Sequence, residues 1–275
     1  MCIQTVGRFC RAVPRFKGKN IIANKLLAPF LRGKGYETIV TLKTPVGGRL
    51  ISGLDDWIPW NVFINGRYEE GCEDYMLDMA KQATVIFDVG ANIGYFAIQF
   101  GKMLHDTGNV HCFEPMKYQF NVLQRNIEEN NLDNIILNKA IVSNEQNAIK
   151  RIYFSGIDNT GSSSLEIESS LYEDVRCITI DEYSVQHNID KIDLMKIDVE
   201  GHELKVLLGA SRMLEARKIG SLFVEVNNNT LTAGGTSSAE IVSFLDSMGY
   251  QPYSIKSGVE KPYVIGDDED LVLFR

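Results

Sequence analysis

Residues 85–94, which run Val-Ile-Phe-Asp-Val-Gly-Ala-Asn-Ile-Gly, constrain the fold more than any other stretch of this chain. The short apolar run predicts a buried strand, and the glycines after it predict a tight turn into a helix. Glycines at such a turn let backbone N–H groups and a helix N-terminus approach a ligand without Cβ atoms in the way. The segment therefore predicts a strand–loop–helix unit of an α/β protein, with a plain structural turn as the alternative.

The turn departs from the dinucleotide-binding pattern, which is G-x-G-x-x-G after a strand. Asn92 stands where the middle glycine would let a pyrophosphate approach, and the acid Asp88 precedes the glycines. The sequence D-x-G-x-N-x-G is instead typical of S-adenosylmethionine (SAM) sites, whose ligand has no pyrophosphate. We therefore expect Asp88, Gly90, Asn92 and Gly94 to bind this cofactor.

Two further acidic motifs follow predicted strands. Glu114 comes after the strand 109–113, about 20 residues beyond Gly94, where a carboxylate can accept hydrogen bonds from ribose hydroxyls. Pro115 fixes φ and lacks an N–H, which suits the exit of that strand. Strand 192–197 leads into Asp198 and Glu200. Ligands of doubly wound sheets lie at the carboxyl ends of the strands, so these acids should share one crevice and favour a cationic cofactor.

Together, Asp88–Gly94, Phe113-Glu114-Pro115 and Lys196–Glu203 resemble the FkbM family of class I SAM-dependent methyltransferases. The resemblance runs from about Tyr68 to the C-terminus. It implies a Rossmann-like α/β fold, with a seven-stranded, mostly parallel sheet and helices on both faces. It also implies O-methylation of a hydroxyl on a carbohydrate, glycolipid or natural product.

The resemblance and the strand ends together supply the remaining site predictions. The general-base candidates are Asp198, Glu200, His202 and Glu225. Asp198 is the first choice because it ends a central strand, and it is also expected to contact the cofactor. The family often has a small residue at the position of His202, which argues against an essential base there. By analogy with class I enzymes, the adenine is expected near Asn138 and Ala140, and the acceptor near Trp57, Ser162, Ser163 and Asn227.

The chain should divide at about residue 66 into an N-terminal extension (1–66) and a methyltransferase domain (67–275). Residues 1–35 are basic and helix-prone, 37–44 and 49–54 predict a hairpin, and 55–66 predict an aromatic loop that packs the arm or stacks on a sugar. From residue 84 on, seven predicted strands alternate with helices, interrupted by two short strands around a Ser-rich loop at 158–165. A polar loop is expected at 227–229.

Charge is distributed unevenly along the chain. Residues 1–43 hold nine basic residues and one acid, a net +8, so the rest must carry −16 to reach the total of −8. The acidic body disfavours a nucleic-acid partner, while the basic arm, with a short amphipathic helix at 21–28, could contact a membrane surface or an anionic partner. Five scattered cysteines, no membrane span and no clear signal peptide favour a cytoplasmic location.

Three alternatives stay open at this point. Asp198 with Asn227 and Asn228 loosely resembles a Mg²⁺ site, but the Asn pair lacks an acid, so no metal ligands are assigned. A nicotinamide-dependent oxidoreductase would fit a similar fold but is disfavoured by Asn92. A noncatalytic SAM-binding protein would share the cofactor residues. The oligomeric state and the identity of the acceptor do not follow from the sequence.

Overall fold

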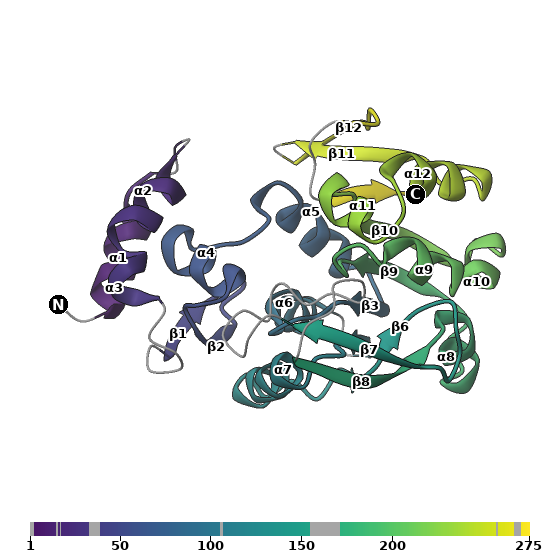
Figure 1. Cartoon of the computed structure of the whole chain (residues 1–275), viewed down its shortest axis with the longest axis horizontal. Helices are drawn as coiled ribbons and strands as arrows, with labels where there is room; N and C mark the ends of the chain where they lie inside the picture. The colour runs from purple at the N-terminus through teal and green to yellow at the C-terminus, as the bar shows by residue number, and fades with distance from the viewer. Residues whose placement is uncertain are drawn as a thin grey trace.

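A single central sheet organises the computed structural model, which describes residues 3–14, 16, 18–32, 39–104, 107–154, 171–256, 258–266 and 271–275. In these residues the sheet has eight strands in the order β12-β11-β13-β10-β9-β3-β4-β5 (Figure 1). The strands are β3 (Val85–Val89), β4 (Asn109–Phe113), β5 (Ile135–Asn138), β9 (Ile192–Ile197), β10 (Ile219–Glu225), β11 (Pro252–Lys256), β12 (Val259–Pro262) and β13 (Leu271–Phe274).

The five strands from β5 to β10 are parallel, and β13 runs antiparallel to both β10 and β11. All seven predicted strands are present, and the Rossmann-like order is confirmed. The predicted number was one too low, because β11 turns back into β12 as an antiparallel edge hairpin. The sequence between residues 259 and 262 is too polar to predict that edge strand.

Helices cover both faces of the sheet, as expected (Figure 1). On one face, Ile86 and Val110 share an apolar cluster with α5 (Glu70–Ala80), α6 (Tyr95–Met103) and α7 (Lys117–Glu129). On the other, Phe87 and Val89 pack with α8 (Ile180–Gln186), α9 (Glu203–Leu208), α10 (Ser211–Glu215), α11 (Asn228–Ala233) and α12 (Ser238–Ser247). Adjacent residues of β3 thus enter different clusters because strand side chains alternate between faces.

The N-terminal extension forms a lobe beside the sheet (Figure 1). Up to residue 54 its described part forms the helices α1 (Ile3–Ala12), α2 (Lys19–Leu26) and α3 (Ala28–Leu31) and the hairpin of β1 (Ile39–Lys43) and β2 (Arg49–Gly53). The hairpin was predicted. The aromatic loop was not a loop: Trp57–Asn65 form helix α4. Pro59 lies in its first turn, where the missing N–H disturbs no helical hydrogen bond.

Helix α4 connects the lobe to the body. Trp60 is fully buried, and its Nε1 donates to Asn24 Oδ1 at 2.7 Å. Phe63 belongs to the same apolar cluster as Tyr95 of α6, so the core is continuous across residue 66. The domain boundary at that residue stays a prediction.

A small second sheet lies near the end of β5. Strand β6 (Ile141–Val142) pairs with β8 (Leu171–Ile178), which forms an antiparallel pair with β7 (Ile149–Phe154), as the two predicted short strands required. The Ser-rich loop between them, including Ser162 and Ser163, lies outside the described residues. In the described part of the chain, no helix combines the length and apolar character that crossing a bilayer requires.

Candidate active site

A cavity of about 170 Å³ lies at the carboxyl ends of β3, β4 and β9. Its wall is built from both predicted glycine turns, from the residues after β4 and from helices α4 and α6. Polar side chains, aromatic side chains and two glycines line it, among them Trp57, Tyr68, Gly90, Asn92, Tyr95, Glu114, Gln119, Lys196, Asp198, Glu200, Gly201 and His202. Functional side chains that follow three strands, far apart in the sequence, therefore lie around one cavity.

The first loop, Asp88–Gly94, closes against the neighbouring strand ends. Gly90 has φ +81°, and a Cβ there would lie 1.9 Å from Asp198 O. The backbone N–H groups of Gly90 and Ala91 donate to Phe113 O at 3.0 and 3.1 Å. Asn92 has φ +49°, and its Oδ1 accepts from Ile93 N at 2.7 Å. Only glycine fits position 90, because the backbone of the second loop occupies the space of a side chain.

Glu114 is buried directly beneath the first loop. Its Oε2 accepts from Asn92 N and its Oε1 accepts from Met116 N, both at 2.9 Å. Burial raises the pKa of this carboxyl to about 7, although both backbone hydrogen bonds act to lower it. The side chain is therefore fixed at the cavity wall, and oxygens held in this way can accept further hydrogen bonds from a ligand's hydroxyl groups.

The buried side chain of Lys196 lines the cavity and lies between two acidic side chains. Lys196 Nζ lies 2.8 Å from Asp198 Oδ2 and 4.0 Å from Asp88 Oδ1, and 5.2 Å from the centroid of the Phe96 ring. Burial opposes the lysine's charge, but Asp198 and Asp88 outweigh it and raise its pKa. Burial also raises the pKa of Asp88 to about 6, against the lowering effect of Lys196. Lys196 is therefore paired with acidic side chains.

The second loop, Asp198–Glu203, also contains residues in the left-handed region and a glycine packed against backbone. Glu200 has φ +55° and Gly201 has φ +102°, and a Cβ on Gly201 would lie 2.3 Å from Thr230 O. Glu203 Oε1 accepts from Val199 N and Gly201 N, both at 3.1 Å, and so holds the loop. The sequence analysis did not assign this role, although an acid at the first turn of a helix is a recognisable signal.

Among the base candidates, Glu200 has the pKa nearest neutrality. Burial, Asp198 and Glu203 raise the pKa of Glu200 to about 7. Burial together with Asp198 and Glu200 raises that of Glu225, at the end of β10, to about 10. His202 is buried, with Nε2 3.1 Å from Ser143 Oγ, and burial lowers its pKa to about 3. His202 is therefore a neutral and very weak base.

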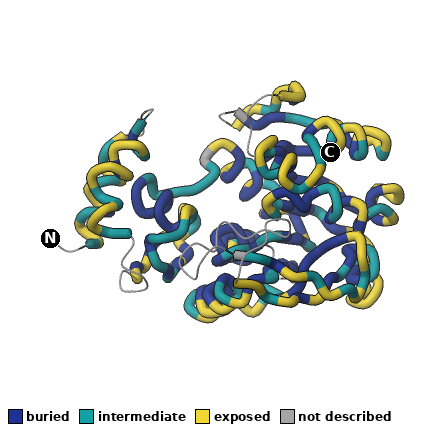
Figure 2. Tube along the Cα trace, viewed as in Figure 1, coloured by how far each residue is buried: buried dark blue, intermediate teal, exposed yellow. Residues whose placement is uncertain are grey.

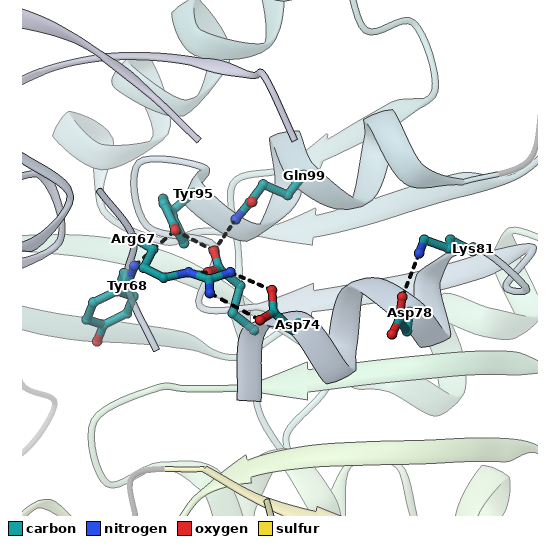
Figure 3. Close-up of polar contacts among 8 residues, drawn as sticks. Arg67, Tyr68, Asp74, Asp78, Lys81, Tyr95 and Gln99 are labelled. Atoms are coloured by element: carbon teal, nitrogen blue, oxygen red, sulfur yellow. Dashed lines mark hydrogen bonds and ion pairs between the residues drawn. The ribbon is translucent and has the colours of Figure 1, made fainter. Parts of the chain in front are cut away.

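A buried polar network positions Tyr68 on the cavity wall (Figure 3). Its backbone N–H donates to Tyr95 OH at 3.0 Å, and Tyr95 OH in turn donates to Glu73 Oε1. Gln99 Nε2 and Arg67 Nε donate to the same carboxylate at 2.9 and 2.7 Å. Because Glu73 is fully buried and accepts three hydrogen bonds, from Tyr95, Gln99 and Arg67, the network fixes the entry to α5. No sequence signal singled out Tyr68.

The structure gathers most of the predicted site residues but not all of them. Gly90, Asn92, Glu114, Pro115, Ala140, Asp198, Glu200, His202 and Trp57 line the cavity, Asp88 is buried behind it, and Gly94 is the N-cap of α6. Tyr95 and Phe96, the first residues of α6, also line it, and their place directly after Gly94 was the signal that was missed.

Asn138 and Asn227 do not line the cavity. Asn138 Nδ2 donates to Cys112 O and Tyr183 OH, both at 3.1 Å. Asn227 is the N-cap of α11 and accepts from Asn229 N at 2.9 Å, so the predicted polar loop is the start of a helix. Both assignments stay predictions, and each side chain has a competing structural role here, because an Asn at a strand or helix end can satisfy the backbone as readily as a ligand.

The charges around the cavity suit a cationic nucleoside. Asp198, Glu200, Glu203 and Glu225 surround one buried lysine in the described structure, and Glu203 Oε2 and Glu225 Oε2 have no hydrogen-bond partner there. Burial first, and then repulsion between neighbouring carboxylates, raises the pKa of Glu200, Glu203 and Glu225, and a bound cation would relieve that repulsion. Gly90 leaves room for a ligand to approach the backbone, and Glu114 offers carboxylate oxygens to hydroxyls. These residues fit SAM.

Comparison with known proteins gives one family. A family model described as "Methyltransferase FkbM domain" matches residues 88–252, more than half of the chain. The match includes both loops and Glu114 but excludes the N-terminal lobe. It thus covers the part of the molecule in which the cavity is formed by β3, β4 and β9.

Individual relatives are more distant. The hexuronic acid methyltransferase AglP of Haloferax volcanii is 27% identical over 202 residues, 73% of this chain and 77% of that protein. Methyltransferase sdnD of Sordaria araneosa is 28% identical over 174 residues, 52% of this chain and 67% of its own. The 31-O-demethyl-FK506 methyltransferase FkbM of Streptomyces tacrolimicus is 26% identical over 158 residues, 47% of this chain and 60% of its own.

Proposed function

The chain belongs to the FkbM methyltransferase family, and we propose that it transfers a methyl group from SAM to a hydroxyl oxygen of a carbohydrate, glycolipid or natural product. SAM is the donor of the family. The observation that carries the proposal is the second loop, in which acids crowd a cavity that Glu114 and the first loop also enter. A polar acceptor with an ionisable hydroxyl needs such a base, whereas a cofactor-binding module does not.

We assign the cofactor to the side of the cavity that is formed by the first loop and Glu114. Gly90 and Asn92 would face its amino-acid part, and Glu114 its ribose. Asp198, whose charge is balanced by Lys196 at 2.8 Å, and the buried Asp88 would stabilise positive charge nearby. When bound, SAM supplies a methyl group already activated on a sulfonium. The adenine lies nearer Ala140 than Asn138 in this assignment, since only Ala140 lines the cavity.

Glu200 is the general base in this proposal. It lines the cavity, its pKa of about 7 suits proton removal at neutral pH, and its backbone is held in the left-handed region. A non-glycine residue in that conformation is disfavoured by roughly 1 kcal/mol or more, and such strain concentrates at functional sites. Asp198 is less suitable because Lys196 already occupies one of its oxygens.

The acceptor is assigned to the side of the cavity formed by Trp57. This indole is about half exposed and lies on α4 beside the other lining residues. Aromatic rings stack on the apolar faces of sugars, so the position suits a carbohydrate ring. The relative named as a hexuronic acid methyltransferase supports the same class of acceptor. Ser162 and Ser163 stay candidates for acceptor contacts.

The test is methyl transfer from radiolabelled SAM to a panel of oligosaccharides and glycolipids with and without hexuronic acid. We expect label in a methyl ether that survives mild alkali. An alkali-labile product would show a methyl ester and overturn the hydroxyl assignment. Binding of S-adenosylhomocysteine (SAH) without transfer to any acceptor class would favour a noncatalytic binding protein, and NADH binding without SAH binding would favour an oxidoreductase.

The proposal also includes a cytoplasmic location. Among the described residues, Cys10, Cys72, Cys112 and Cys177 form no disulfide bond, as expected where thiols are kept reduced. Fractionation of the native host cells, followed by immunodetection of the full chain in the cytoplasmic and extracytoplasmic fractions, tests it directly. Recovery of the protein outside the cytoplasmic membrane would contradict this part of the proposal without affecting the assignment of the reaction.

A further inference from the structure

The outer surface of the N-terminal lobe displays an unusual number of large apolar side chains. Sixteen such side chains are exposed in the described structure, and six of them lie between residues 9 and 30 (Figure 2). The six, here called the arm patch, are Phe9, Phe16, Ile21, Ile22, Leu26 and Phe30. Phe9 and Phe30 are 71% and 72% exposed. Exposed apolar side chains gathered in this way mark an interaction surface.

The lobe is already attached to the body through its other face, so the arm patch is not an undocked core. A Cβ on Gly7 would lie 2.6 Å from the Phe63 ring, which shows how closely α1 approaches α4. Arg11 donates to Phe63 O at 3.0 Å, and Asn20 donates to Asn61 at 2.9 Å. With the inner faces of α1 and α2 fixed by these contacts, the arm patch stays directed outward.

The charge of the lobe indicates what covers the patch. Residues 1–36 contain eight basic residues and no acid, whereas the chain beyond residue 43 carries −16. Exposed Arg8 precedes Phe9, and exposed Lys25 lies one helical turn from Ile21. Ile22 and Leu26 also lie one turn apart on α2. Apolar side chains interspersed with cations on short amphipathic helices suit the interface of an anionic bilayer.

A second copy of the chain is a poorer partner for the same surface. Symmetric dimers place the same patch of both subunits face to face. Here that arrangement would bring two sets of eight basic residues together without a compensating acid in either segment. An anionic lipid surface instead pairs each cation with a headgroup charge and accepts the apolar side chains between the headgroups.

We propose that the arm patch docks the protein on the surface of an anionic lipid bilayer. Helix α4 packs on α1 and carries Trp57 at the cavity, so docking would bring the cavity near the lipid surface. A membrane-associated glycolipid acceptor would then be in reach. This last consequence rests on the proposed function, whereas docking does not require any methyl transfer.

Vesicle co-sedimentation of the full-length chain tests the docking. We expect the wild type to pellet with phosphatidylcholine vesicles that contain phosphatidylglycerol, and to stay in solution with pure phosphatidylcholine. The triple variant Phe9→Ser, Leu26→Ser, Phe30→Ser should bind the anionic vesicles at least about tenfold more weakly, since each apolar side chain removed from the interface lowers affinity. Raising the salt concentration should weaken the wild type as well.

The matched control is Ile149→Ser, Val264→Ser, which removes equally exposed apolar side chains from the body. It should bind like the wild type, and SAH titration should show that all variants are folded. Equal binding by the triple variant and the wild type would overturn the proposal, as would a wild type that does not bind anionic vesicles. Size-exclusion chromatography that showed self-association large enough to account for the pelleting would overturn it as well. Because no acceptor enters this assay, its failure is separate from a failure to detect methyl transfer.

Discussion

The two glycine loops at the cavity share two backbone features but hold their carboxyl groups differently. Each has a non-glycine residue at positive φ, Asn92 at +49° and Glu200 at +55°. Each also has a glycine whose side-chain space is filled by a backbone carbonyl, 1.9 Å away for Gly90 and 2.3 Å for Gly201.

At the first loop, each oxygen of the nearby carboxylate, Glu114, accepts one hydrogen bond from a backbone N–H group at 2.9 Å. In the second loop a different residue, Glu203, makes the equivalent bonds, and Glu200 is left to line the cavity. Burial raises the pKa of both Glu114 and Glu200 to about 7, but their surroundings give them two purposes. The carboxyl group at the first loop is held for hydrogen bonding, whereas the one in the second loop faces the cavity and can take up a proton. Substitutions in the two loops should separate these purposes.

The largest effect is expected from Gly90→Ala in the first loop. The new Cβ would meet Asp198 O, so the two loops must separate, and we expect SAH binding to be lost together with about 3 kcal/mol or more of stability. Titration calorimetry and urea unfolding measure the two quantities.

Gly47→Ala is the matched control, because Gly47 has the same φ of +81° but no atom within 4 Å of a Cβ. It should lose only the conformational term of about 1 kcal/mol and keep its affinity for SAH. Equal losses in the two variants would show that φ, not contact between the loops, decides the outcome.

Glu200→Gln should have the next largest effect, on catalysis and not on cofactor binding. We expect kcat to fall about 10²- to 10⁴-fold, the range for loss of a general base, with the Kd for SAH nearly unchanged. In the wild type kcat should rise with pH through about 7, since the carboxyl must lose its proton to act as a base. The variant should lack this rise.

Glu215→Gln, which neutralises an exposed acid on α10, is the control for the change in net charge. It should leave both kcat and its pH dependence as in the wild type. If Glu200→Gln keeps the rise near pH 7, the base is another group, and the distinction between the two loops fails.

How far the sequence predicts this site depends on whether a residue's partners are local. Gly90 and Gly94 could be identified because backbone turns have local signatures, and the parallel strand order places Glu114 and Asp198 at one edge. For Asn138 and Asn227 the sequence could not show the competing partners that the fold supplies, Tyr183 and Asn229. Patterns of residue type do not rank such competitors.

The contribution of Tyr68 could not be predicted for a related reason. Its position depends on a network in which Glu73 receives hydrogen bonds from α6 and from the preceding loop. Those partners are six to twenty-six residues from Glu73, at spacings that carry no periodic signal. The helical state of 57–65 was missed because Pro59 and two tryptophans are common in loops as well.

Glu114→Gln tests the fixed carboxylate of the first loop and should have a smaller effect. An amide can accept only one of the two backbone hydrogen bonds, and its NH₂ group would face the other N–H. We expect SAH affinity to fall about 10- to 100-fold, the range for losing a charge-assisted hydrogen bond, with kcat at saturating SAM changed much less. Glu128→Gln on α7 is the exposed control. A large fall in kcat with unchanged affinity would contradict the assignment.

The smallest effect concerns His202, which lies in the second loop but is buried like the groups of the first. Burial lowers its pKa to about 3, so the folded protein keeps the imidazole neutral while the unfolded chain takes up a proton below about pH 6.5. The stabilising contribution is therefore complete above pH 6.5 and is lost as the pH falls toward 3. Between pH 6.5 and 5 the stability advantage of wild type over His202→Asn should shrink by about 1–2 kcal/mol in urea unfolding.

Ser143→Ala, which removes the partner of Nε2 but keeps the imidazole, should show a difference from wild type that varies little over the same range. A similar pH dependence in both variants would mean that the hydrogen bond to Ser143, and not burial, lowers the pKa of the imidazole. A loss of kcat in His202→Asn as large as in Glu200→Gln would show that His202 is the base.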